Sequence, residues 1–403
     1  MRILVADKFP LAARDTLAAA GFEIDVSPQL SGDSLAQALV DGQAEVLVVR
    51  STKVTQEVFE RCPSLSLVVR AGAGVNTIDR AAASRYGVFV ANCPGKNAIA
   101  VAELTFGLLL ALDRQIPAAT SALKSGVWDK KTYGAGRGLY GRRLGLLGFG
   151  AIAREVAARG GAFGMQVSAF TPRLDAGTAA ALGATAVATL DELLRTSDVL
   201  SVHVPYSEST HHLVGAEQLA RLPDQAIVLH TARGGVVDDE ALAQEVRSGR
   251  LRAGLDVFEG EPSSGRAEFA HPLLAAESGF CGTPHIGAST AQAEAATADE
   301  VIRIITDFAS RGVVHNVVNV LTDRPARCTV VVRHLDRVGV LAGVLDTLRR
   351  EGLNVQQMQN VVFSGSSAAA CATIALECEP SSAVVSALQG QADVLAVDIR
   401  AAR

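Results

Sequence analysis

Short runs rich in valine, leucine and isoleucine alternate with alanine-rich segments of helical spacing along most of this chain of 403 residues. Runs this short and this apolar are typical of strands buried on both faces of a sheet. Their alternation with helical segments predicts parallel sheets covered by helices on both sides. The predicted strands are Arg2–Ala6, Val46–Val49, Leu67–Val69, Val88–Val90, Arg143–Leu147, Gln166–Phe170, Val199–Val204, Ala226–His230 and Gly254–Val257.

The length allows two or three domains of ordinary size. The apolar helical segment Asn97–Arg114 is expected to lead from a first sheet domain to a second. A second helical segment, Ser289–Phe308, is expected to lead back to the first. We therefore predict a discontinuous α/β domain of residues 1–98 and 288–322 around a continuous α/β domain of residues 99–287.

The pattern changes after Asn319, where Thr322–Pro325 is predicted to be a linker. The remaining segments follow the order βαββαβ, which is that of a ferredoxin-like module, and we assign residues 326–403 to it. The predicted elements are Cys328–His334, Val340–Glu351, Val355–Phe363, Ala368–Leu376, Ser381–Gln389 and Val394–Arg400.

Charge and composition exclude several classes of function. The net charge of −5 and the aromatic content of 4% argue against a general nucleic-acid binder, which needs basic and stacking side chains. The six cysteines lie far apart without a C-x-x-C pair, which is typical of reduced thiols rather than of disulfides or a zinc site. The most apolar stretch, Leu104–Leu112, is too short to span a bilayer. We expect a cytoplasmic protein without a metal centre or membrane contact.

A glycine-rich turn follows the predicted strand Arg143–Leu147 and opens a helix. Gly148-x-Gly150-x-x-Ala153 fits the dinucleotide fingerprint, in which the glycines allow a tight turn and close approach of the pyrophosphate. The phosphate charge then lies at the positive end of the helix. Gly148, Gly150, Ala151 and Ile152 are therefore predicted to contact a dinucleotide.

The next strand of such a unit ends in the residue that contacts the ribose, and this position is Thr171. NAD-binding sites usually have an acidic residue there, whereas this chain has Thr171 followed by Arg173. A neutral hydroxyl and an arginine suit the 2′-phosphate of NADP. Thr171 can equally bond the free ribose hydroxyl of NAD with Arg173 in solvent, so both cofactors stay open.

Three chemically active residues follow predicted strands of the second domain: Arg233, Glu261 and His285. Ligands of open α/β sheets bind beyond the carboxyl ends of the strands, so these side chains are expected to meet. An arginine can bind a carboxylate with two parallel hydrogen bonds, and a histidine is the natural base for an alcohol near neutral pH. A neighbouring glutamate fixes the tautomer of the histidine and raises its pKa.

At this point the chain resembles the D-isomer-specific 2-hydroxyacid dehydrogenases, over residues 1–320. The resemblance rests on segments in a shared order behind the glycine turn. They are Arg50-Ser-x-Lys53, Arg70-Ala-Gly-x-Gly74, Asn92-x-Pro-Gly, Glu103-Leu-Thr, Val202-His203-Val-Pro205, Arg233-Gly-Gly, Leu255-Asp256-Val-Phe, Glu261-Pro262 and Pro284-His285-x-Gly287. It implies a flavodoxin-like substrate-binding domain of residues 1–98 and 288–322, and a Rossmann dinucleotide-binding domain of residues 99–287.

The resemblance also implies roles for matching residues. Arg233 binds the substrate carboxylate, His285 exchanges the hydroxyl proton, and Glu261 orients His285. Asp256 holds the nicotinamide carboxamide. Further cofactor contacts are expected at His203, Pro205, Thr231, Ala232 and Gly287. Ala73 and Gly74 are expected to face the substrate, with its phosphate at Arg50, Lys53 or Arg70.

The substrate implied in this way is D-3-phosphoglycerate, oxidised to 3-phosphohydroxypyruvate on the route to serine. The alternatives are a glyoxylate, hydroxypyruvate or other 2-hydroxyacid reductase, and a non-catalytic dinucleotide-sensing corepressor. Three positions depart from the family pattern: Lys96, the segment 138–141 and His230. His203, His211 and His212 show no spacing that requires a metal.

The C-terminal module resembles an ACT domain, a regulatory fold that binds amino acids between paired copies. His334, Asp336 and Asn354 are the candidate ligand contacts, and serine is the candidate effector. The alternative is that Asp336 caps a helix and the module only dimerises. Either way we expect a homo-oligomer, a dimer or a tetramer. The same topology occurs in RNA-binding domains, but no aromatic-rich strand matches their signature.

Overall fold

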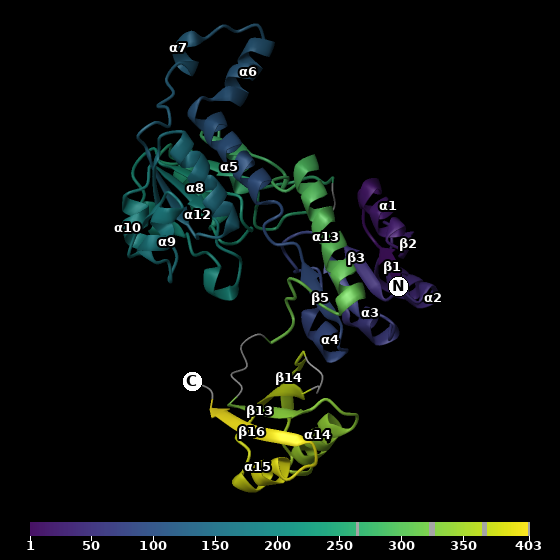
Figure 1. The fold of residues 1–403 in the computed structure, drawn as a ribbon. Coiled ribbons are helices and arrows are strands. Elements are labelled where there is room, and N and C mark those ends of the chain that lie inside the picture. Colours follow the sequence, from purple (N-terminus) through teal and green to yellow (C-terminus); the bar gives the residue numbers. More distant parts are fainter. Residues whose placement is uncertain (263–265, 322–326, 365–368, 402–403) are drawn as a thin grey trace. The chain divides into compact units, whose positions relative to one another are not determined.

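The structure is a computed structural model that describes residues 1–262, 266–321, 327–364 and 369–401. The chain divides into two compact units, Met1–Asn319 and Val320–Arg403, each described by itself below. Two parallel sheets form the first unit and an antiparallel sheet forms the second (Figure 1). None of the helices within the described ranges is long and apolar enough to cross a membrane.

The first sheet has the strand order β2-β1-β3-β4-β5, with every pair parallel. This is the order of a flavodoxin-like, doubly wound sheet. Its strands are β1 (Arg2–Val5), β2 (Glu23–Val26), β3 (Val46–Val49), β4 (Leu67–Arg70) and β5 (Phe89–Asn92). The predicted strands at 2–6, 46–49, 67–69 and 88–90 are confirmed within one or two residues.

Helices cover both faces of this sheet. On one face lie α2 (Gly32–Gly42), α3 (Gln56–Arg61) and α4 (Arg80–Arg85). On the other lie α1 (Leu11–Ala19) and α13 (Ala291–Arg311), whose Val301, Ile304 and Ile305 pack into the core of the sheet. A helix 200 residues away in sequence thus completes the first core, which supports the predicted return of the chain. The domain boundaries themselves remain predictions.

The second sheet has seven parallel strands in the order β12-β11-β10-β9-β6-β7-β8. This is the strand order of a Rossmann fold with one strand added at an edge. The strands are β6 (Arg143–Leu147), β7 (Gln166–Phe170), β8 (Thr185–Ala186), β9 (Val199–Val202), β10 (Ile227–His230), β11 (Arg252–Leu255) and β12 (Phe280–Gly282). The order reverses between β6 and β9, so the crevice for a dinucleotide is expected there.

One face of this sheet packs on α5 (Ala98–Asp113) and α8 (Ala151–Ala162), and the other on α10 (Leu190–Arg195), α11 (Ala216–Ala220) and α12 (Asp239–Arg247). The predicted crossover at 97–114 is therefore α5. It is followed by α6 (Ile116–Lys124) and α7 (Lys130–Tyr133), which project from the body of the unit in Figure 1. The helix α9 (Ala176–Ala181) and the 3₁₀ turns η1 (Glu208–Thr210) and η2 (Pro272–Ala275) complete the unit.

The second unit contains β13 (Cys328–Leu335), α14 (Val340–Arg350), β14 (Val355–Val362), β15 (Ala369–Leu376), α15 (Ser382–Gln389) and β16 (Val394–Ala401). The strands are antiparallel in the order β14-β15-β13-β16, with α14 and α15 packed on one core. This confirms the predicted ferredoxin-like order. The linker predicted at 322–325, and the first residue of the strand predicted at 368–376, lie outside the described residues.

Three strands were not predicted from the sequence: β2, β8 and β12. Their side chains are largely exposed or half-buried, because β2 and β12 lie at sheet edges and β8 has only two residues. An edge strand needs no continuous apolar run, so its sequence does not stand out from a loop.

Candidate active site

The glycine turn after β6 has the geometry that its sequence predicted. Gly148 has a φ of 91°, and a Cβ at this position would lie 3.0 Å from the carbonyl carbon and oxygen of His203. The turn therefore requires glycine on both conformational and steric grounds. Gly150, by contrast, has no atom within 4 Å of such a Cβ and is exposed. Space for a ligand is left at Gly150, where the fingerprint expects the pyrophosphate.

Helix α8 begins directly at this turn, with Gly150 as its N-cap and no side chain bonded to its first amides. Those amides and the helix dipole form an anion-binding end, reached by the exposed Ala151 and half-buried Ile152. The uncapped helix and the crowded Gly148 fit a bound dinucleotide.

The remaining predicted cofactor residues lie at the carboxyl ends of neighbouring strands. Thr171 follows β7 and is half-buried, whereas Arg173 is exposed. His203 and Pro205 follow β9, and Thr231 and Ala232 follow β10. The hydroxyl groups of Thr231 and Thr105 lie 3.1 Å apart, so helix α5 supports the end of β10.

His285 and Glu261 form a close pair. His285 Nδ1 donates to Glu261 Oε2 at 2.6 Å, while Glu261 Oε1 accepts from the Phe258 amide at 2.9 Å. Burial alone would raise the pKa of Glu261, but these two hydrogen bonds and the charges of His285 and Arg233 lower it. A carboxylate only accepts, so the proton lies on Nδ1 and His285 Nε2 keeps its lone pair for another partner.

The loop that carries His285 is held by Asp256, which is 2% exposed. Asp256 Oδ1 accepts from the Thr283 hydroxyl at 2.6 Å and the Ile286 amide at 2.8 Å, and Oδ2 accepts from the Gly287 amide at 2.8 Å. His285 itself has a φ of 52°, a left-handed conformation that is uncommon for residues other than glycine. Both carboxylate oxygens of Asp256 therefore act on the loop, a positioning contact that its sequence did not reveal.

The backbone of Arg233 is held by His230, one of the positions that depart from the family pattern. His230 Nε2 donates to the Arg233 carbonyl at 2.8 Å, and Arg233 Nη1 donates to the Ala232 carbonyl at 2.6 Å. His230 is fully buried, and burial lowers its pKa to about 4, so the ring is neutral at physiological pH. A Cβ on Gly74 would lie 2.9 Å from Arg233 Nη2, which shows how closely the loop after β4 approaches this guanidinium.

A cavity of about 750 Å³ is lined by residues that follow strands of both sheets of the first unit, among them Arg50, Arg70, Gly72, Ala73 and His285. Burial, together with the charges of Arg233 and Arg50, lowers the pKa of Arg70, whose Nε is buried without a hydrogen-bond partner. Arg50 and Arg70 line this cavity, and Arg233 lines a neighbouring cavity that shares His285 with it, so three guanidinium groups repel one another near this histidine. Such an arrangement is stabilised by an anion.

The loop that carries Arg50 is fixed by Asp7 at the end of β1. Asp7 Oδ2 accepts from the amides of Arg50 and Thr52 at 2.7 and 3.0 Å, and Oδ1 accepts from the Ser51 hydroxyl at 2.7 Å. Burial alone would raise the pKa of Asp7, but these hydrogen bonds lower it. The Arg50 side chain forms an ion pair with Glu294 of α13 at 2.9 Å.

The structure differs from the sequence prediction in which lysine lines the cavity. Lys53 is exposed and is not among the residues that line the cavity, whereas Lys8, which the sequence did not single out, lines it. Lys96, noted as unusual, forms an ion pair with the buried Glu300 at 3.1 Å.

In the second unit, His334 is 1% exposed and bonds the Leu335 carbonyl through Nδ1 at 2.8 Å and the Asn360 side chain through Nε2 at 3.2 Å. Asp336 and Asn354 are exposed. The alternative that Asp336 caps a helix is wrong, because α14 has Gly339 as its N-cap and no side-chain cap. Glycine at this position, with a φ of 94°, turns the chain into the helix without one.

Comparison with known proteins places these observations in one family. Residues 106–287 match the model of the D-isomer specific 2-hydroxyacid dehydrogenase NAD binding domain. A D-3-phosphoglycerate dehydrogenase of Methanocaldococcus jannaschii is 40% identical over 321 residues, 79% of this chain and 59% of that protein. The chain thus spans about three fifths of that relative's length. A hydroxypyruvate reductase of Thermotoga maritima is 44% identical over 286 residues, 70% of this chain and 90% of the relative.

Solved structures show the same fold. The D-lactate dehydrogenase of Aquifex aeolicus, solved as a complex with NAD and lactic acid, superposes with a TM-score of 0.66 at 26% identity. The match covers 80% of this chain and all of that one.

Proposed function

The chain belongs to the D-isomer specific 2-hydroxyacid dehydrogenases, and on this premise we propose that it oxidises D-3-phosphoglycerate to 3-phosphohydroxypyruvate. The observation that carries the proposal is that Arg50 and Arg70 line one cavity at His285, while Arg233 lines a second cavity at the same histidine. A substrate with a carboxylate at one end and a phosphate at the other matches this excess of positive charge. Lactate or glyoxylate has a single anionic group. With its carboxylate at Arg233 it offers no partner to Arg70, whose buried Nε has no hydrogen-bond partner, whereas Arg50 is already paired with Glu294.

In the proposed mechanism, Arg233 binds the substrate carboxylate and the oxygen at C2. His285 Nε2 accepts the hydroxyl proton, and Glu261 stabilises the resulting imidazolium through Nδ1. A nicotinamide dinucleotide held at the turn of Gly148 and Gly150 would supply the hydride acceptor for C2. In the reverse direction His285 returns the proton to the oxygen at C2.

Arg70 and Arg50 hold the phosphate in this proposal, and Lys8 adds a third positive charge at the same cavity. Lys53, which was predicted for this role, has the same charge but lies outside the cavity lining. Gly74 allows the substrate loop to pass close to Arg233.

A second candidate function is reduction of hydroxypyruvate or glyoxylate, favoured by the reductase of Thermotoga maritima, of which this chain covers 90%. The third candidate is a non-catalytic, dinucleotide-sensing corepressor. Such a protein transfers no proton and so does not require the His285–Glu261 pair.

The test measures NAD(P)H consumption with 3-phosphohydroxypyruvate, hydroxypyruvate and glyoxylate. We expect the highest kcat/KM with the phosphorylated substrate, and a loss of about 10²–10⁴-fold in kcat for His285→Ala. Arg70→Gln should raise KM for the phosphorylated substrate much more than for hydroxypyruvate. Equal use of both substrates by the parent would assign the reductase function, and inactivity on all three would favour the corepressor.

We further propose that Thr171 and Arg173 set the choice between NAD and NADP. The substitution Thr171→Asp places a carboxylate beside the ribose and should raise the preference for NADH over NADPH by about tenfold or more. Comparing kcat/KM for both cofactors in parent and variant measures this. An unchanged ratio would move the discrimination to other residues.

The second unit is proposed to bind an amino acid such as serine between paired copies, with His334, Asp336 and Asn354 near the ligand. Its ferredoxin-like topology supports this proposal. A homo-oligomer and a cytoplasmic location belong to the same proposal. Titration of the turnover rate with serine tests the effector, and light scattering tests the assembly.

A further inference from the structure

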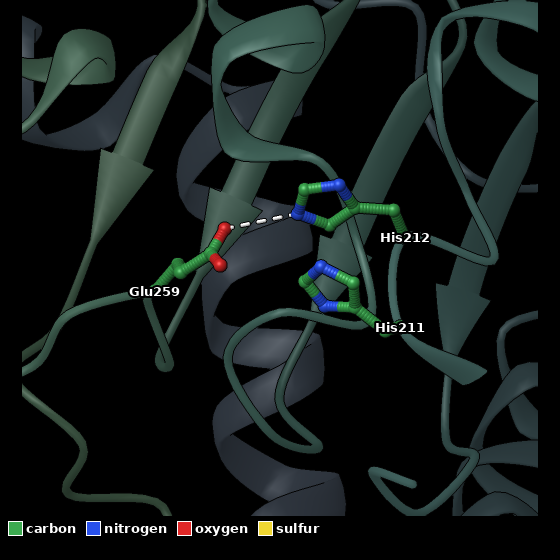
Figure 2. A group of neighbouring side chains, drawn as sticks. All are labelled: His211, His212 and Glu259. Atoms are coloured by element: carbon green, nitrogen blue, oxygen red, sulfur yellow. Dashed lines mark hydrogen bonds and ion pairs between the residues drawn. The ribbon is translucent and has the colours of Figure 1, made fainter. Parts of the chain in front are cut away.

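His211, His212 and Glu259 form a cluster that the catalytic proposal does not use. Their ligand-type atoms, one from each residue, all lie within 4.8 Å of one another. His212 Nε2 donates to Glu259 Oε2 at 3.0 Å, and the two imidazole rings are stacked with centroids 3.9 Å apart. Figure 2 shows both rings facing the Glu259 carboxylate from the same side.

The backbone explains why two consecutive histidines point the same way. His212 has a φ of 49°, in the left-handed region, and its amide donates to the Gly235 carbonyl at 2.8 Å. Neighbouring side chains in extended backbone point to opposite sides, whereas this local reversal brings both rings together. The third member arrives from another loop, between β11 and β12, 47 positions further along the chain.

From this geometry we propose that His211, His212 and Glu259 bind a divalent transition-metal ion of the Zn²⁺ class. Two imidazole nitrogens and one carboxylate oxygen are the donor set that such ions prefer, whereas Ca²⁺ and Mg²⁺ prefer oxygen alone. Bonds of about 2.0–2.1 Å in a tetrahedron separate the ligand atoms by roughly 3.4 Å, which small rotations of these side chains can reach. A fourth position is left for water.

Charge and accessibility fit this ligand. The side chains of His212 and Glu259 are 36% and 48% exposed, so an ion can enter from solvent. Asp238 Oδ2 lies 3.9 Å from His212 Nδ1 on the opposite side of the ring. When Nε2 binds the metal, the ring proton moves to Nδ1 and faces this carboxylate, the arrangement that orients many metal-bound histidines.

The ion would act as a clamp. It would join the segment that ends at His212 to the loop that carries Glu259, and Glu261 follows in that loop after a single residue. Glu259 also borders the cavity that Arg233, Glu261 and His285 line. Binding should therefore stabilise the loop that supports the His285–Glu261 pair.

His211 distinguishes a metal site from a simple surface pair. Its ring makes stacking and edge contacts with His212 and Tyr206, and no hydrogen bond within the described part of the chain. Its loss should hardly change the fold but should remove one ligand. The matched control is His315, which forms the same kind of pair with a carboxylate, Asp307, at 2.6 Å without a second imidazole.

The experiment titrates the full chain with Zn²⁺ against a chromophoric chelator, in a Cys378→Ser background because that thiol is exposed. We expect one Zn²⁺ per chain. His211→Ala and Glu259→Gln should each weaken binding at least as much as the roughly 10–100-fold that loss of an outer-sphere partner costs. His315→Ala should bind like the parent.

Thermal unfolding gives a second measurement. Saturating Zn²⁺ should raise the melting temperature of the parent by about 2 °C or more, and that of Glu259→Gln by less. Glu259→Gln keeps an acceptor for His212, so it stays informative if His211→Ala fails to fold. Absence of stoichiometric binding in the parent, or equal affinity in the parent and both ligand variants, overturns the proposal. Neither result depends on turnover.

Discussion

At the scale of single residues, the candidate site depends on which groups are neutral and which are charged. His230 is buried and neutral, and burial also lowers the pKa of the nearby His203 to about 3. Each ring has a buried Nδ1 without a hydrogen-bond partner. The ring of His230 nevertheless holds the Arg233 carbonyl, so a residue outside the usual family pattern positions the proposed carboxylate-binding arginine.

This burial gives the first prediction, on pH and stability. The pKa of His230 is about 4 in the folded chain, against about 6.5 when unfolded, so the unfolded state binds the proton first as pH falls. The contribution of neutral His230 is complete above pH ~6.5 and is lost progressively towards pH ~4, by at most about 3.4 kcal/mol.

Urea unfolding of the parent and of His230→Asn at several pH values measures the effect. Below pH ~6.5 the free energy of unfolding should fall less steeply with decreasing pH in the variant than in the parent. Above pH ~6.5 the free energies of unfolding of the two proteins should change in parallel. A parent and variant with the same decline would show that His230 is not the group responsible.

The second prediction concerns Glu261. In Glu261→Gln, the side chain keeps its size but no longer stabilises a protonated His285, so kcat should fall by roughly 10²-fold with a smaller change in KM. The pH dependence of kcat should shift as well, which a purely structural effect would not produce. Glu277→Gln, an exposed position in the same connection between β11 and β12, is the control. A kcat like that of the parent would remove Glu261 from the mechanism.

At the scale of elements, the two glycines of the turn between β6 and α8 have different roles. Gly148 is required by the backbone, because it has positive φ and faces the His203 carbonyl. Gly150 has ordinary φ and open space beside it. One glycine therefore serves the fold, and the other leaves room for a ligand.

This difference predicts opposite results for two alanine variants. Gly148→Ala should destabilise the chain by about 1–3 kcal/mol through strain and contact with His203. Gly150→Ala should keep the parent's melting temperature but weaken dinucleotide binding, because its methyl group fills the space for pyrophosphate. Thermal unfolding and fluorescence titration with NADH and NADPH measure the two properties. Normal cofactor affinity in Gly150→Ala would contradict the assigned approach of the pyrophosphate.

At the scale of the whole molecule, the two units have separate cores. The first unit closes with Asn319, whose side chain bonds the Val90 amide at 2.8 Å and the Val88 carbonyl at 2.9 Å at the edge of β5. The candidate catalytic residues all precede this point. All residues assigned to the proposed chemistry therefore lie in the first unit.

A chain ending at Asn319 should fold, keep the kcat of the full chain and lose any response to serine. Far-UV circular dichroism, turnover with 3-phosphohydroxypyruvate and light scattering test these points. A folded but inactive truncated chain would show that the second unit contributes to the catalytic site. A smaller assembly with normal kcat would assign oligomer contacts to the second unit.

Local patterns determined much of this protein from sequence alone. Buried strands need continuous apolar runs and the fingerprint turn needs its glycines, so both sheets, the crossover α5, the returning helix α13 and the order of the second unit were predictable. Edge strands such as β2 were not predicted, because they are less buried and their sequences therefore show no continuous apolar run.

Only the tertiary structure decided which distant side chains meet. Sequence could name Arg50, Lys53 and Arg70 as candidates, but the packing of the loops determines that Arg50 and Arg70, with Lys8, line the cavity. Asp256 as the support of the His285 loop, and Glu259 beside two stacked histidines, are likewise products of packing. These contacts join separate loops across tens of residues. No local propensity encodes a distance of this kind, because it depends on how whole elements pack.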